Sequence, residues 1–149
     1  MRHLFIALAI AAAGFLTACE SRPAEPVDAT QEAWYGRSVK QVASINREAE
    51  SDFENGKADR AAALIQEAEP LVARLLAVRH PNLAANEVAS DLDQLYGRML
   101  LSNRHWGWAR LQFQKNLSRW KHWTPQTADT ERRIKEAEAG VAECDRHMD

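Results

Sequence analysis

The chain contains few cysteines, glycines and prolines, and it lacks a second long apolar run. Its 149 residues include two cysteines, six glycines and five prolines, with 46% hydrophobic and 27% charged residues. This composition is typical of a helix-rich globular domain. The longest apolar run, Leu4–Leu16, has 13 residues, fewer than the roughly 20 that a membrane-spanning helix needs. The sequence therefore predicts one domain that does not cross a membrane.

Motifs that would place catalytic groups or a cofactor together are also missing. The sequence has no Gly-x-Ser-x-Gly elbow, no His-Glu-x-x-His, no Cys-x-x-Cys and no glycine-rich phosphate loop. Cys144, Asp145 and His147 come nearest to a ligand cluster, but a metal normally needs three or four ligands in suitable positions. Cys144 also falls on the apolar side of a predicted helix, which favours a buried, unreactive thiol. We therefore expect no enzyme activity, no cofactor and no metal site.

The N-terminus has the pattern of an export signal. Arg2 and His3 give a short cationic start, and the apolar run follows directly. The four residues Leu16-Thr17-Ala18-Cys19 resemble the lipobox of bacterial lipoprotein precursors. The resemblance implies cleavage before Cys19, acylation of that cysteine and attachment of the mature chain to the lipid bilayer. The alternative is an ordinary secretory signal in which the cysteine has no role.

These signals divide the chain into three parts. Residues 1–18 are predicted to be a removed signal peptide, 19–29 a lipidated cysteine with a flexible tether, and 30–149 a helical domain. The tether is polar and contains two prolines, so it extends over roughly 30 Å. Glu20 is not the aspartate that retains lipoproteins in the inner membrane of enterobacteria-like systems. By that resemblance, we expect the cell envelope, at the periplasmic face of the outer membrane.

The domain shows the apolar spacing of three and four residues that is typical of amphipathic helices, and no sustained strand pattern. Pro70 predicts a kink in the second helix. Short connections favour antiparallel hairpins, so the sequence predicts an all-α array of such hairpins. The five expected helices span about Gln31–Glu54, Ala58–Val78, Leu83–Leu101, His105–His122 and Asp129–His147. Asp28 is the candidate N-cap of the first of these helices, and Asn82 is that of the third.

Two of these hairpins resemble the tetratricopeptide repeat, in which small residues lie where two helices cross and large residues lie beside them. The first hairpin carries Ala49, Phe53, Gly56, Ala61, Ile65 and Ala68 at the motif's offsets, and the second carries Gly97, Leu100, Ala109 and Phe113. The pattern departs from the family in its longer spacing and in Arg104, which occupies a turn position where glycine is usual. The resemblance implies recognition of a protein or peptide on a concave helical surface. The alternative fold is a generic helical bundle.

The stretch from Arg98 to Trp123 is basic and rich in tryptophan. It lies within a region, between Asp93 and Asp129, that has no acidic residue. Six bases fall in this region: Arg98, Arg104, Arg110, Lys115, Arg119 and Lys121. The bases could pair with acidic neighbouring helices, or they could form an anion-binding surface.

Two helical stripes divide the aromatic residues of this stretch. Trp106, Ala109, Phe113, Leu117 and Trp120 form a stripe that is typical of a core. A second stripe carries Trp108, Leu111, Lys115 and Trp123. If the second stripe is exposed, the candidate binding residues are Trp108, Arg119, Lys121, His122 and Trp123. Nucleic acid is not expected as a ligand, because the predicted export removes the protein from it.

The sequence thus predicts a membrane-anchored, non-catalytic helical scaffold that binds a protein partner in the bacterial cell envelope. The alternative is direct binding of an anionic envelope component, a cell-wall polymer or a lipid headgroup, through the basic fourth helix.

Overall fold

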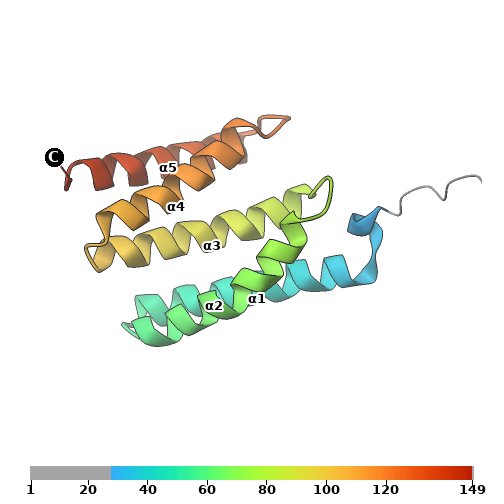
Figure 1. Ribbon diagram of the computed structural model, residues 1–149, viewed down its shortest axis with the longest axis horizontal. Helices are drawn as coiled ribbons and strands as arrows, with labels where there is room; N and C mark the ends of the chain where they lie inside the picture. Colours follow the sequence, from blue (N-terminus) through green and yellow to red (C-terminus); the bar gives the residue numbers. More distant parts are fainter. Residues whose placement is uncertain (1–27, 149) are drawn as a thin grey trace, which may run out of the picture.

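The computed structural model describes residues 28–148, and its regular structure in this range is helical throughout (Figure 1). A short 3-10 turn, η1 (Ala29–Gln31), precedes five α-helices. The α-helices are α1 (Ala33–Glu54), α2 (Ala58–Leu76), α3 (Leu83–Ser102), α4 (Trp106–Lys121) and α5 (Ala128–Asp145). The all-α prediction and the five helices are confirmed. The predicted lipobox, the signal peptide and most of the tether lie outside the described residues.

The helix ends follow from local capping chemistry. The Oδ1 atom of Asn82 accepts a hydrogen bond from the Ala85 N–H and begins α3, as predicted. Thr127 and Thr130 form a reciprocal capping box at the start of α5. Gly56, at φ +74°, follows α1 and adopts the left-handed conformation that ends many helices. The predicted start of the first helix was two residues early, because Asp28 caps η1 instead of α1.

Consecutive helices pack against one another as antiparallel hairpins. The closest pairs are α1 with α2, α3 with α4, and α4 with α5. α2 contains Pro70, and its second half departs from the direction of its first half in Figure 1, as the predicted kink requires. α3 packs against all four other α-helices, whereas the backbones of α1 and α5, and those of α2 and α4, do not approach each other closely. α3 therefore forms the centre of the array, between the α1–α2 hairpin and the α4–α5 hairpin (Figure 1).

The core has two parts. The larger part joins α1, α2 and α3 around Tyr35, Val42, Ile65 and Leu75. The smaller part lies between α3, α4 and α5 and is built around Phe113. The small residues that the repeat-like pattern singled out are buried at the helix contacts: Ala49, Ala61, Ala68, Gly97 and Ala109.

Arg104 lies in the turn between α3 and α4, with φ at +62°. This is the left-handed conformation that glycine adopts without steric cost. At this turn position the repeat-like pattern usually has glycine, and Arg104 adopts the backbone conformation that such a glycine would have.

Candidate binding groove

The structure confirms the division of α4 into two stripes in part, since Trp106 and Leu117 of the first stripe and Trp123 of the second are half-buried. Ala109, Phe113 and Trp120 are buried, and the Nε1 atom of Trp120 donates a hydrogen bond to the Ser90 hydroxyl at 2.8 Å. On the opposite side, Trp108 is 66% exposed and Leu111 is 53% exposed. α4 thus faces the core with one side and solvent with the other.

The five predicted binding residues do not form one surface. Trp108 lies at the first turn of α4, whereas Arg119 is only 10% exposed at its side chain and pairs with Asp93. Trp123 is half-buried and packs edge-on against Trp120, with ring centroids 6.2 Å apart. The remaining two are exposed but engaged: the Lys121 Nζ atom lies 3.0 Å from Glu138, and His122 Nδ1 lies 2.8 Å from the Ser118 carbonyl oxygen.

Most of the bases in the acid-free stretch are paired with acids from other helices. These ion pairs are Arg98–Glu50, Arg110–Asp145, Lys115–Asp93, Arg119–Asp93 and Lys121–Glu138. Arg104 is the one base of the six with no ion pair within residues 28–148. The sequence left two interpretations of these six bases, pairing with acidic neighbouring helices or an anion-binding surface. Pairing is confirmed for five of them.

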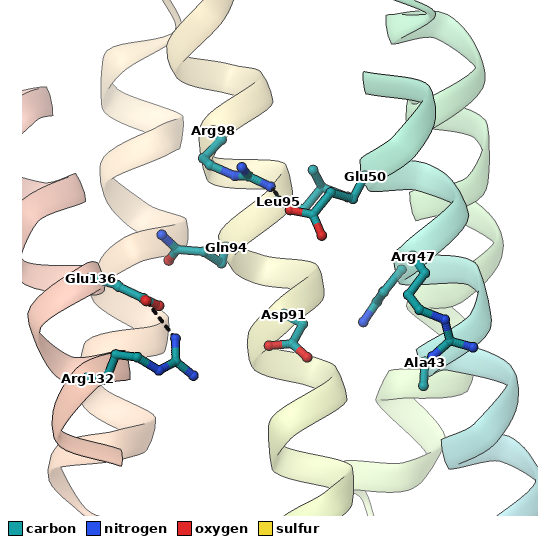
Figure 2. A pocket seen from close by; sticks show the side chains of 10 residues that line it. Ala43, Arg47, Glu50, Asp91, Gln94, Leu95, Arg98, Arg132 and Glu136 are labelled. Carbon is teal, nitrogen blue, oxygen red and sulfur yellow. Dashed lines mark hydrogen bonds and ion pairs between the residues drawn. The ribbon is translucent and has the colours of Figure 1, made fainter. Parts of the chain in front are cut away.

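A groove runs along α3 between α1 and α5, on the side where these two outer helices stay apart. Its volume is about 490 Å³, within the range of small-ligand sites. Figure 2 shows side chains from all three helices around it. Its lining residues are Ala43, Asn46, Arg47 and Glu50 from α1, Asp91, Gln94, Leu95 and Arg98 from α3, and Arg132 and Glu136 from α5.

Asn46 is the most informative residue of the groove. It is buried, and its Nδ2 atom donates a hydrogen bond to the Val88 carbonyl oxygen on α3 at 2.8 Å. This bond fixes the orientation of the amide. Its Oδ1 atom is buried and has no hydrogen-bond partner in the described part of the chain. Leaving such an acceptor unpaired costs about 1–3 kcal/mol, so the fold tolerates a deficit at this position.

A second unpaired atom lies in the same groove. The Nε atom of Arg98 is buried without a partner, while the guanidinium group reaches Glu50 on α1 through Nη2 (Figure 2). Within residues 28–148, three buried side-chain polar atoms have no hydrogen bond. Two of them belong to this groove, and the third, Asp52 Oδ2, lies 3.0 Å from Arg60 Nε in an ion pair. The two unpaired atoms are an acceptor, Asn46 Oδ1, and a donor, Arg98 Nε. Both atoms are closed off from solvent, so a ligand with N–H and C=O groups satisfies them only when neighbouring side chains move aside.

The charges of the groove are balanced. Three arginines and three acids line it, and most of them are paired: Arg98 with Glu50, Arg132 with Glu136, and Asp91 with Arg133. Hydrogen bonds from Arg133 and Arg132 also lower the pKa of Asp129 beside the groove, which keeps that carboxylate ionised. Arg47 is exposed and has no ion pair among the described residues. The groove therefore attracts polar ligands without a strong preference for either charge.

The remaining cysteine is structural. Cys144 is fully buried in the smaller core, and burial raises the pKa of its thiol, so the reactive thiolate is disfavoured. In residues 28–148 no three His, Cys, Asp or Glu side chains gather into a metal-binding group. None of the helices in this range is both long and apolar enough to cross a membrane.

Comparisons of the chain with family models, with curated proteins and with solved structures found no match. The resemblances to the lipobox and to the tetratricopeptide repeat therefore stay predictions, and the functional argument depends on the geometry of the groove.

Proposed function

We propose that this protein is a non-catalytic binding module that holds an extended, polar segment of a partner protein in the groove along α3. The observation that carries the proposal is the buried Asn46 Oδ1, an oriented acceptor without a donor. When the side chains that cover this oxygen move aside, a main-chain N–H of a bound segment would supply that donor, and its neighbouring carbonyl groups would accept from Arg98 or Arg47. Buried polar groups are almost always paired in folded proteins, so an acceptor without a donor calls for a partner that the fold itself does not supply.

The composition of the groove favours this ligand over others. An amphipathic helix needs an apolar floor, but here only Ala43 and Leu95 are apolar. A nucleic acid needs an excess of positive charge, and the groove has none. From Ala43 to Glu50 the groove follows α1 for about 10 Å, calculated from the helical rise. About three residues of an extended chain cover that length.

The predicted lipid anchor places this module in the cell envelope. If Cys19 is acylated, the domain stays within about 30 Å of the bilayer, which is the reach of the tether. The partner would then be another envelope protein, and the outer membrane is the expected location. Incorporation of radiolabelled palmitate at Cys19, lost in Cys19→Ser, tests the anchor separately from the groove.

Direct binding of a cell-wall polymer through the predicted basic residues has less support. Arg119 and Lys121 are held by Asp93 and Glu138, so neither charge is free for such a ligand.

Cross-linking in living cells tests the groove. A photoreactive benzophenone side chain in place of Gln94, which lines the groove, should give a discrete cross-linked product with one partner protein after illumination. The matched control places the same side chain at Ser44, an exposed residue of α1 that does not line the groove. We expect no product from position 44.

The partner is identified by mass spectrometry of the product, and the cross-linked peptide shows whether a continuous segment is bound. Equal products from positions 94 and 44, or none from position 94, would contradict the proposed function.

A further inference from the structure

The exposed side of α4 carries an apolar patch with bases at both ends. Trp108 and Leu111 are three residues apart, so they lie one above the other on one face of the helix. Arg104 lies in the turn before α4, and Lys115 follows Leu111 by one turn. We call these four residues the α4 patch. Together Trp108 and Leu111 form a small exposed apolar area, the kind of feature that marks a contact surface when a partner extends over it.

The charge of the α4 patch is positive. Asp93 is buried and accepts from two bases, Arg119 and Lys115, at 2.8 and 2.7 Å. One carboxylate cannot neutralise two cations, and the more exposed of the two is Lys115, with 55% of its side chain accessible. Arg104 adds a second charge without an acidic partner among the described residues. The acids near Lys115 come from other helices, namely Asp93 and Glu69, which line the same small hollow. The unpaired positive charge of the α4 patch is therefore that of Arg104.

The α4 patch and the groove use different sides of α3. Gln112 and Lys115 line a small hollow with Tyr96 of α3 and residues of α2, whereas the groove uses Asp91, Gln94 and Arg98 with α1 and α5. A surface that covers the α4 patch would therefore leave the groove open.

We propose that the α4 patch docks on the surface of an anionic lipid bilayer. Tryptophan is well suited to the membrane interface because its ring is apolar and its N–H is polar, and leucine adds apolar contact beside it. Arginine and lysine at the edges are attracted to anionic headgroups. We choose a bilayer as the occupant because the predicted lipid anchor at Cys19 would hold every copy of the protein close to a membrane surface.

The tether is long enough for such docking. Nine residues, 20–28, separate the predicted lipidated cysteine from η1, and they reach about 30 Å. The first turn of α4 lies at the opposite end of the array from η1 (Figure 1), and α1 alone is about 33 Å long. The domain would thus lie along the membrane with α4 toward it. This proposal does not depend on the function proposed for the groove.

Tryptophan fluorescence in vesicles tests the docking. The native protein, isolated with the N-terminus that the cell gives it, is combined with vesicles of phosphatidylcholine and phosphatidylglycerol whose acyl chains carry bromine. Brominated chains quench only tryptophans that approach the bilayer. We expect quenching in these vesicles, less quenching in pure brominated phosphatidylcholine, and a decrease as salt is added.

Two leucines make a matched pair of variants. Leu111→Glu puts a negative charge in the α4 patch and should remove most of the quenching. Leu83→Glu changes another exposed leucine, 42% accessible at the start of α3, and should leave the quenching as it is. Circular dichroism checks that both variants are folded. Trp108→Phe serves as a second test because it removes the expected reporter and should abolish the quenched component.

The proposal is overturned if the native protein shows no quenching, or if Leu111→Glu and Leu83→Glu behave alike. It is also overturned if quenching persists in Trp108→Phe. Cross-linking from position 94 should be the same in Leu111→Glu as in the native protein, so failure of the docking is distinguished from failure of the groove.

Discussion

Replacing Gly140 by alanine should lower the free energy of unfolding by about 3 kcal/mol, the upper end of the cost of overpacking a core. Gly140 lies on α5 against the ring of Phe113, and an added Cβ would come within 2.5 Å of that ring. The ring has little room to move, because it also packs closely against Gly97 of α3, where an added Cβ would likewise come within 2.6 Å of it. Urea denaturation followed by circular dichroism measures the effect.

Gly36 provides the control for this change. It also lies within a helix, α1, but a Cβ at Gly36 would have no atom within 4 Å. Alanine at this position should therefore stabilise the protein by about 0.5–1 kcal/mol through its higher helix propensity. If both alanine variants shifted the urea midpoint in the same direction, close packing of α3, α4 and α5 around Phe113 would not explain the effect.

Replacing Arg119 by methionine should cost about 3 kcal/mol of stability, because it breaks a buried ion pair by removing one partner. Arg119 donates to Asp93 at 2.8 Å and to Asn116 at 2.6 Å, and both partners are buried between α3 and α4. Methionine keeps much of the side-chain volume, so the loss reports the charge and its hydrogen bonds. Thermal unfolding measured by circular dichroism gives the change.

Lys115→Met is the matched variant, since it removes the other base that contacts Asp93. The Lys115 side chain is 55% exposed, and exposed ion pairs contribute less than about 1 kcal/mol. We expect a small effect. Similar losses for Arg119→Met and Lys115→Met would show that burial does not distinguish the two bases, and the account of α4 would be wrong.

The helices could be predicted from the sequence because their signals are local. Apolar spacing defined each helix within about two residues, and Asn82 was identified as a cap from its position alone. The separation of Trp108 from Trp120 also followed from helical geometry, since the two residues fall on opposite stripes. Such inferences need only the period of the helix.

The candidate site could not be predicted, because its residues come from three helices and have ordinary polar character. Asn46, Gln94 and Arg132 are far apart in the sequence, and polar residues on amphipathic helices usually face solvent. Only the packing of α1 and α3 shows that Asn46 is buried with an unpaired oxygen. The role of Arg119 was similarly hidden, because its partner Asp93 is 26 positions away. The tryptophan-rich stretch can be recognised from composition alone, whereas the groove exists only once three separate helices pack together.

The central claim is that Asn46 is kept for binding and not for stability, and one variant measures both. Asn46→Leu removes the unpaired oxygen and fills its place with an apolar group of similar size. We predict that the free energy of unfolding changes by less than about 1 kcal/mol, because removal of the unpaired acceptor offsets the loss of the hydrogen bond to the Val88 carbonyl oxygen, while the cross-linked product from position 94 disappears. A larger loss of stability in Asn46→Leu, with the cross-linked product retained, would contradict the account.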